Sequence, residues 1–131
     1  DWRFIAEERS SNFSDVIRPD YINIIDYLEF ESGEFFKAGD YLRDMHDKLG
    51  SGICLVAVQK NRGSALGRGG NLGLEKPRLY LTMDNDKIKI QKAKNWVTQT
   101  NPNGLVLEYK VVKGCQFFVT RDWYKPDEPG Y

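Results

Sequence analysis

The sequence has little cysteine and histidine and no long apolar run. Its 131 residues include two cysteines and one histidine. Cys54 lies inside an apolar run, where cysteine acts as a small buried hydrophobic residue, so we expect neither a disulfide framework nor a zinc site. No run approaches the about 20 apolar residues that a membrane span needs, and no signal peptide is recognisable. We therefore expect an intracellular, cytoplasmic protein with no membrane partner.

The formal net charge is zero, from 19 basic and 19 acidic residues, but the two signs are separated along the chain. Residues 1–50 hold 6 basic and 12 acidic residues, whereas residues 51–131 hold 13 basic and 7 acidic residues. Nine of the basic residues lie within residues 60–94. Because partners meet local charge and not the total, the zero sum does not exclude a polyanionic partner.

The hydrophobic pattern of the first half predicts a strand, a helix and a second strand. Residues 21–25 are apolar apart from Asn23 and are followed by Asp26, and residues 53–58 are apolar throughout. Between them, from Glu34 to Leu49, apolar residues recur at spacings of three and four, which is typical of an amphipathic helix. Continuous apolar runs are typical of parallel strands covered on both faces. The order predicts a parallel βαβ unit with a right-handed crossover.

Antiparallel hairpins are predicted for the second half. Residues 78–83 and 87–92 have strand patterns on either side of a short polar turn, and residues 105–112 pair with 116–120 across Lys113-Gly114. The predicted fold class is therefore α/β, a partial core whose parallel βαβ strands continue into antiparallel hairpins.

Five glycines within residues 61–73 predict a mobile loop between the two halves. The length suits one domain, which we place at residues 1–123, followed by a loose tail at residues 124–131. The chain begins at Asp1 without a methionine, and we expect a fragment of a longer protein.

Asp26 and Gln59 are the first candidate functional residues. A carboxylate at the carboxyl end of a buried parallel strand lies where open α/β sheets bind ligands, and in nucleotide hydrolases such an Asp holds Mg²⁺, usually through water. Gln59 follows the neighbouring strand, where its amide can hydrogen-bond a terminal phosphate or its attacking water. The simpler alternatives are a capping role for Asp26 and a polar strand terminus for Gln59.

Four cations form a second set of candidates. Arg62 and Arg68 in the glycine-rich loop fit contact with a nucleic-acid backbone, although a flexible linker is the alternative. Lys92 and Lys94 project on one side of an extended chain, where they can bind a phosphate, including one held by a neighbouring subunit. A solvated strand end is the alternative for this pair.

The order of these segments resembles the second half of a RecA-like ATPase core, in particular the branch of DnaB-like replicative helicases and phage helicases. Four segments carry the resemblance. Residues 22–29 resemble Walker B, with the family's Ile-Asp-Tyr-Leu verbatim at 25–28, and residues 53–60 resemble the strand with a phosphate-sensing Gln. Residues 61–73 fall where the family has a DNA-binding loop, and Lys92-Ala-Lys94-Asn95 with Asn101-Pro-Asn-Gly104 resembles a Lys-x-Arg-Asn segment and its downstream glycine. Lys94 stands where the family carries Arg, and Lys lacks its planar fork.

The resemblance implies part of a DNA-dependent ATPase (helicase, helicase-loader or recombinase type) acting in DNA replication or recombination, with ATP and Mg²⁺ as cofactors. It implies single-stranded DNA and a homo-oligomeric ring or filament as partners. Asp26 then organises Mg²⁺ and Gln59 senses the γ-phosphate. Lys60, Arg62 and Arg68 approach DNA, while Lys92 and Lys94 reach the nucleotide of the adjacent protomer.

The sequence contains no Walker A motif and no strand with the family's catalytic glutamate, so we expect this chain alone to be inactive. Whether the chain is part of an enzyme therefore depends on whether the longer protein supplies these missing segments. The alternative is a non-catalytic nucleic-acid-binding or assembly module with a degenerate RecA-like sheet, and a metal-dependent nuclease is more distant.

Overall fold

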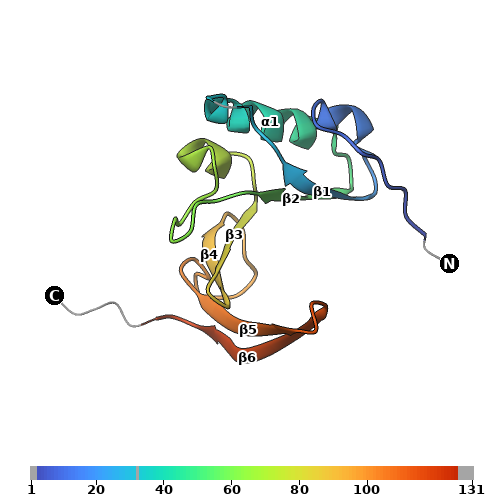
Figure 1. Cartoon of the computed structure of the whole chain (residues 1–131). Coiled ribbons are helices and arrows are strands. Elements are labelled where there is room, and N and C mark those ends of the chain that lie inside the picture. The colour runs from blue at the N-terminus through green and yellow to red at the C-terminus, as the bar shows by residue number, and fades with distance from the viewer. Residues whose placement is uncertain (1–2, 32, 127–131) are drawn as a thin grey trace. The chain divides into compact units, whose positions relative to one another are not determined.

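A computed structural model describes residues 3–31 and 33–126, and the chain divides into two compact units. Unit 1 comprises Asp1–Lys60 and Arg68–Lys76, and unit 2 comprises Asn61–Gly67 and Pro77–Tyr131. Unit 1 contains a parallel two-stranded sheet, and unit 2 contains an antiparallel four-stranded sheet (Figure 1). The protein is therefore a mixed α/β protein, as its sequence predicts.

Unit 1 is built around a βαβ arrangement. β1 (Ile22–Leu28) pairs in parallel with β2 (Ile53–Val58), beginning with Ile22 opposite Ile53. A short 3₁₀ turn, η1 (Phe13–Val16), precedes β1, and the helical connection consists of the 3₁₀ turn η2 (Phe35–Lys37) and α1 (Ala38–Lys48). α1 lies over one face of the sheet (Figure 1). The predicted parallel pair with its helical crossover is confirmed.

The core of unit 1 lies between α1 and the sheet. Met45 of α1 and Leu28 of β1 are each only 2% exposed, and Ile17 and Ile25 complete the buried cluster. Fully burying a side chain of this size contributes about 1.5–3 kcal/mol. The helix and the parallel pair therefore stabilise one another through this one face.

Two details of the predicted strands are wrong. β1 continues to Leu28, so Asp26 lies inside the strand and not at its end. The apolar runs are also not covered on both faces, because Ile24 is 69% exposed and Leu55 is 56% exposed. Ile24 and Leu55 are partners in the register and alternate with the residues that face α1, so they lie on the opposite face of the sheet.

The second half of the glycine-rich segment forms regular structure. Gly70–Leu74 forms a 3₁₀ turn, η3, which contacts α1. Gly69 has φ +103°, and a Cβ on it would lie 2.5 Å from the Cβ of Ala38. This close approach requires glycine. The segment is thus not one continuous irregular loop, because glycines allow its chain to lie against the helix.

Unit 2 is a sheet of two hairpins, with the strand order β3-β4-β5-β6. Its strands are β3 (Leu79–Asp84), β4 (Lys87–Ala93), β5 (Val106–Val112) and β6 (Gln116–Tyr124), and all neighbours are antiparallel. Asn85-Asp86 and Lys113-Gly114 form the tight turns with positive φ at both positions, the geometry that matches strand twist. The predicted hairpins are confirmed.

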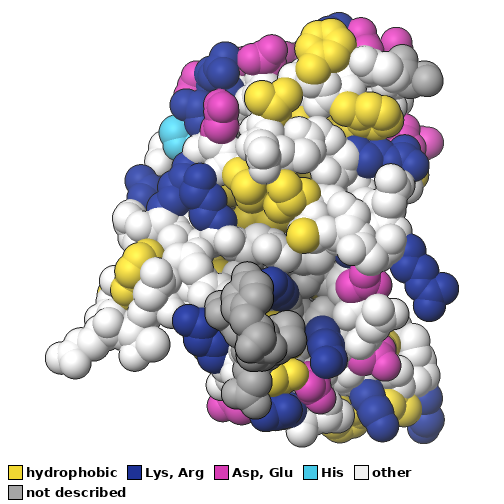
Figure 2. Space-filling view, turned by 90° about the vertical axis from the view of Figure 1, so that its left-hand side faces the viewer, with side chains coloured by type: hydrophobic (Ala, Val, Ile, Leu, Met, Phe, Trp, Pro, Cys, Tyr) yellow, Lys and Arg dark blue, Asp and Glu magenta, His cyan; other side chains and the backbone are white. Residues whose placement is uncertain are grey.

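The two faces of the unit 2 sheet differ in polarity. The strand register places apolar side chains on one face: Leu79, Leu81, Met83, Ile88, Ile90, Leu107, Tyr109, Val111, Phe117 and Val119. The opposite face carries most of the charges: Asp84, Lys87, Lys89, Glu108, Lys110 and Arg121. We call this second face the polar face. In Figure 2 apolar side chains lie open at the surface among charged ones.

The predicted tail begins inside β6, which ends at Tyr124. Residues 127–131 of that tail lie outside the described residues. None of the helices formed by residues 3–31 and 33–126 has the length and apolar character needed to cross a lipid bilayer.

Candidate functional site

A pocket of about 420 Å³ opens in unit 1 at the carboxyl ends of the two parallel strands. Leu28 ends β1 and Gln59 follows β2, so the sheet itself supplies part of the lining. The other lining residues come from the N-terminal segment, the β1–α1 connection, α1 and the middle of the glycine-rich segment: Ser10, Ser11, Asn12, Phe13, Glu29, Phe30, Glu31, Glu34, Tyr41 and Arg68. This edge is where open α/β sheets bind ligands.

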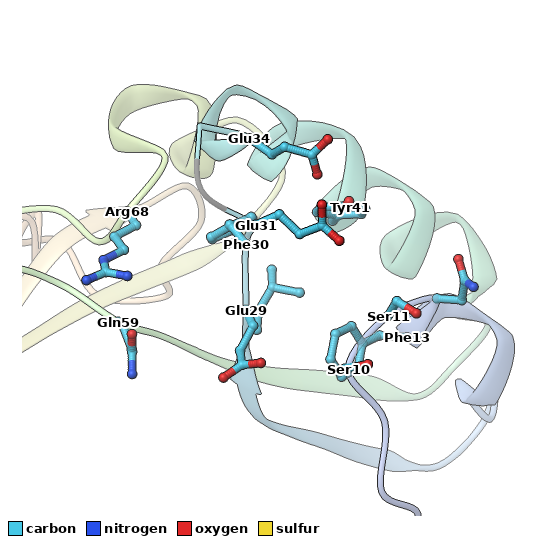
Figure 3. Close-up of a pocket in the computed structure, with 12 residues that line it drawn as sticks. Ser10, Ser11, Phe13, Glu29, Phe30, Glu31, Glu34, Tyr41, Gln59 and Arg68 are labelled. Carbon is cyan, nitrogen blue, oxygen red and sulfur yellow. The ribbon is translucent and has the colours of Figure 1, made fainter.

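Gln59 and Arg68 lie together at one end of this pocket, away from Ser10 and Ser11 (Figure 3). The backbone amide of Arg68 donates a hydrogen bond of 2.8 Å to the carbonyl oxygen of Gln59. The Arg68 guanidinium carbon lies 5.7 Å from the ring centroid of Phe35, within the range of a cation–π contact. Two residues that the sequence assigned to different tasks, phosphate sensing and DNA contact, therefore share one site.

Three glutamates give the pocket an acidic character: Glu29, Glu31 and Glu34. Glu29 accepts a hydrogen bond from the Tyr27 hydroxyl, and this bond is the main cause of the raised Tyr27 pKa. Glu34 forms an ion pair with Lys37, whose pKa is raised mainly by that hydrogen bond. Because Arg68 is the one cation among the described residues of the lining, a phosphate ligand here requires an additional cation between it and the glutamates.

Asp26 lies on the other face of β1 from the core and is exposed. It is not one of the residues that line the pocket. Among the described residues, no group of three or more His, Cys, Asp and Glu side chains is placed to hold a metal ion. A magnesium ion at Asp26 fits only with most of its ligands coming from water and phosphate oxygens, which is how Mg²⁺ commonly binds.

The remaining candidate residues are distributed over both units. Lys60 is half-buried at the end of unit 1, whereas Arg62, Lys92 and Lys94 belong to unit 2. Lys92 is near the end of β4, and the backbone amide of Lys94 donates a 2.9 Å hydrogen bond to the Arg78 carbonyl, which holds the end of this hairpin. The structure brings Gln59 and Arg68 together within unit 1, whereas Arg62, Lys92 and Lys94 are residues of unit 2.

A row of alternating charges crosses the polar face of unit 2. Asp84, Lys87, Glu108 and Arg121 are successive partners across the four strands. Lys87 Nζ lies 3.6 Å and Arg121 Nη1 lies 4.0 Å from Glu108 Oε1. The Tyr124 hydroxyl donates a hydrogen bond to Glu108, and this bond, followed by the two cations, lowers the Glu108 pKa. Glu108 is therefore a fixed anion that organises the cations around it.

Sequence reasoning missed this row of charges in unit 2. The alternation in residues 87–91 showed Lys87 and Lys89 on one side of a strand, but the partners across the hairpins depend on the register. Comparisons with protein-family models, curated proteins and solved structures found no match to this chain.

Proposed function

We propose that the chain is part of a RecA-like, DNA-dependent ATPase of the helicase, helicase-loader or recombinase type, acting in DNA replication or recombination. The observation that carries this proposal is the parallel pair with Asp26 in β1 and Gln59 directly after β2. Gln59 lies at the carboxyl edge of the sheet, in a pocket with Arg68. A carboxylate and an amide on adjacent parallel strands suit a nucleotide with its magnesium ion.

Each candidate residue has a role in this proposal. Asp26 contacts a water-bound Mg²⁺, and Gln59 senses the terminal phosphate and transmits its state through its carbonyl to Arg68. Lys60, Arg62 and Arg68 contact single-stranded DNA. Lys92 and Lys94 contact the nucleotide of a neighbouring protomer in a homo-oligomer. ATP binding needs a phosphate-binding loop, which must come from chain outside the 131 residues because these contain no Gly-Lys-Ser/Thr.

The test is ATP turnover by a protein that carries this chain together with a phosphate-binding loop. Asp26→Asn is expected to abolish turnover and leave the circular dichroism spectrum unchanged, because it removes one charge from an exposed site. Asp44→Asn, a change of the same type on the exposed side of α1, is the matched control and is expected to retain activity. Normal turnover by Asp26→Asn contradicts the proposed site, as does Mg²⁺-dependent turnover by the 131-residue chain alone.

The role of Lys92 and Lys94 across a subunit interface has a separate test. Neither Asp26→Asn subunits nor Lys92→Ala/Lys94→Ala subunits are expected to hydrolyse ATP alone. A mixture of the two contains interfaces with an intact Asp26 on one side and intact lysines on the other, so turnover is expected to return. Failure of mixed oligomers to recover activity excludes the action of these lysines on a neighbour.

A non-catalytic nucleic-acid-binding or assembly module is the second candidate. The charge of unit 2 favours it, since its described residues hold 10 basic and 4 acidic side chains, a difference of six positive charges. Such a module binds single-stranded DNA in a salt-dependent way that ATP does not alter. Binding that is unchanged by ATP and by Gln59→Ala in the parent protein therefore supports the module over the ATPase.

A further inference from the structure

The polar face of unit 2 combines cations with an exposed aromatic ring. Lys87 and Lys89 on β4 and Lys110 on β5 lie on this face, and their side chains are exposed. Phe118 of β6 is the direct partner of Lys110 in the register and is 52% exposed. Directly opposed residues have Cβ atoms about 5 Å apart, so these two side chains leave the sheet from adjacent positions on the same face.

The first half of the glycine-rich segment lies on the same face. Three even-numbered residues of β3 hold it there: Tyr80, Thr82 and Asp84. The Gly67 amide donates to the Tyr80 hydroxyl at 2.8 Å, the Thr82 hydroxyl donates to the Ala65 carbonyl, and the Gly63 amide donates to the Asp84 carboxylate at 2.9 Å.

Arg62 is the residue before Gly63, so it is positioned at the Asp84 end of β3. Asp84 is the register partner of Lys87, so the backbone of Arg62 lies near the position of the first lysine of β4.

The charge balance of this face is positive. It carries Arg62, Lys87, Lys89, Lys92, Lys110 and Arg121 against Asp84 and Glu108, a difference of four charges. Glu108 is engaged by Lys87, Arg121 and Tyr124, whereas Lys89 and Lys110 form no ion pair with another described residue. Lys87 and Lys89 are two residues apart on one strand, which separates them by about 7 Å along the strand. Repeated cations beside a ring suit a chain of phosphates and bases.

We infer that the polar face of unit 2, including Arg62, Lys87, Lys89, Lys110 and Phe118, is a binding surface for single-stranded nucleic acid. The cations contact the phosphate backbone, and Phe118 stacks on an unpaired base, which is the combination used by single-strand binders without sequence preference. This surface deepens the proposed function, because it takes single-stranded DNA from that proposal as its ligand. It needs neither ATP nor Asp26.

The experiment measures binding of a fluorescent oligo(dT) of about 30 nucleotides to the full chain by anisotropy over a range of salt concentrations. Lys89→Gln/Lys110→Gln is expected to weaken binding by about 3- to 10-fold at low salt and to reduce the slope of log K against log salt by about 1.4, or 0.7 for each lost phosphate contact. Arg3→Gln/Lys48→Gln, which removes two exposed cations of unit 1, is the charge-matched control. If the two double variants lower the oligo(dT) affinity and the salt slope equally, the proposed binding surface is wrong.

Phe118 has a matched control on its own strand. Phe117 is 50% exposed but lies on the opposite face, stacked on Tyr109. Phe118→Ala is expected to weaken oligo(dT) binding by about fivefold or more, Phe118→Trp is expected to retain it, and Phe117→Ala is expected to leave it unchanged. Equal losses in the two alanine variants overturn the stacking assignment, as does equal affinity for duplex DNA or for poly-glutamate.

The failure of this surface can be told apart from the failure of the proposed function. If Arg68→Gln lowers oligo(dT) affinity but Lys89→Gln/Lys110→Gln does not, DNA binds through unit 1 and the surface is wrong, while the proposed DNA partner stands. If the unchanged chain does not bind oligo(dT) at low salt, both the surface and the DNA partner are wrong. Loss of turnover in Asp26→Asn affects neither outcome.

Discussion

The Arg68 backbone amide donates a 2.8 Å hydrogen bond to the Gln59 carbonyl, and this bond joins the two ends of the loop that contains residues 61–67. This bond places the residue after β2 next to the middle of the glycine-rich segment. A movement of Gln59 that breaks the bond removes one of the contacts that position Arg68. The two residues are therefore coupled through the backbone, whatever ligand their side chains contact.

The position of Arg68 depends on its neighbour Gly69. Gly69→Ala is expected to destabilise unit 1, because the new Cβ lies 2.5 Å from the Ala38 Cβ and the residue has φ +103°. We expect backbone strain of about 1–2 kcal/mol and overpacking of about 1–3 kcal/mol. Urea unfolding followed at 222 nm measures this loss, because α1 gives most of that signal.

Gly63→Ala is the matched control for Gly69→Ala. Gly63 also has positive φ, at +75°, but a Cβ on it meets nothing within 4 Å. It therefore carries the backbone strain without the overpacking, and its effect falls on unit 2. If the unfolding followed at 222 nm shows that Gly69→Ala loses no more stability than Gly63→Ala, the packing of η3 against α1 is contradicted.

Local sequence patterns predict the helix, strands and turns of this fold, but they do not predict how these elements cover one another. The spacing of Leu42, Met45 and Leu49 indicated the helix, and Lys113-Gly114 indicated a two-residue turn, because periodicity and turn geometry depend on nearby residues. The exposure of Ile24 and Leu55 was not predictable, because it depends on what covers a face and not on the strand itself.

Residues of the site could be placed from the sequence only where the order of the elements is enough to place them. Asp26 and Gln59 were placed on adjacent parallel strands from the order of the elements alone. The row through Glu108 and Arg121 depends on two register shifts between β5 and β6, which no local pattern specifies. Arg68 reaches the pocket because of the close contact between Gly69 and Ala38, a tertiary effect.

The core of unit 1 lies between α1 and one face of the sheet, so truncating a side chain there is expected to destabilise the unit. Met45→Ala is expected to lower the free energy of unfolding of unit 1 by about 2–5 kcal/mol, because Met45 is 2% exposed and its removal leaves a cavity. Met45→Leu conserves volume and is expected to cost less than about 1.5 kcal/mol. Asp44→Ala, on the exposed side of the same helix, is expected to stay within about 0.5 kcal/mol, and urea titration at 222 nm distinguishes the three.

The hydrogen bond from Tyr124 to Glu108 predicts a pH dependence for unit 2. The folded-state pKa of Glu108 is lowered from 4.5, first by Tyr124 and then by Lys87 and Arg121. A depressed pKa means that these contacts stabilise the fold above about pH 4.5 and that the contribution is lost as the pH falls through the lowered folded value. Tyr124→Phe is expected to raise the Glu108 pKa toward its ordinary value, as measured by NMR titration of the Glu108 carboxyl carbon.

The control for Tyr124→Phe is Tyr109→Phe, because Tyr109 lies on the opposite face of the sheet and stacks on Phe117. It is expected to leave the Glu108 titration unchanged. If both variants shift the Glu108 pKa equally, the shift reflects a general change in the sheet and not the loss of one hydrogen bond.

The two cysteines predict a difference in thiol reactivity that reports on each unit separately. Cys54 is half-buried in β2 on the α1 side of the sheet, and burial raises its pKa, so little thiolate is present at about pH 8. Cys115 is exposed after the β5–β6 turn. Cys115 is expected to react quickly with Ellman's reagent and Cys54 slowly, so Cys115→Ser leaves the slow phase and Cys54→Ser leaves the fast one. Met45→Ala loosens the packing of α1 on β2, so it is expected to accelerate the reaction of Cys54 and leave that of Cys115 unchanged. If Cys54 of the unchanged chain already reacts at the rate of a free thiol, α1 does not cover this strand.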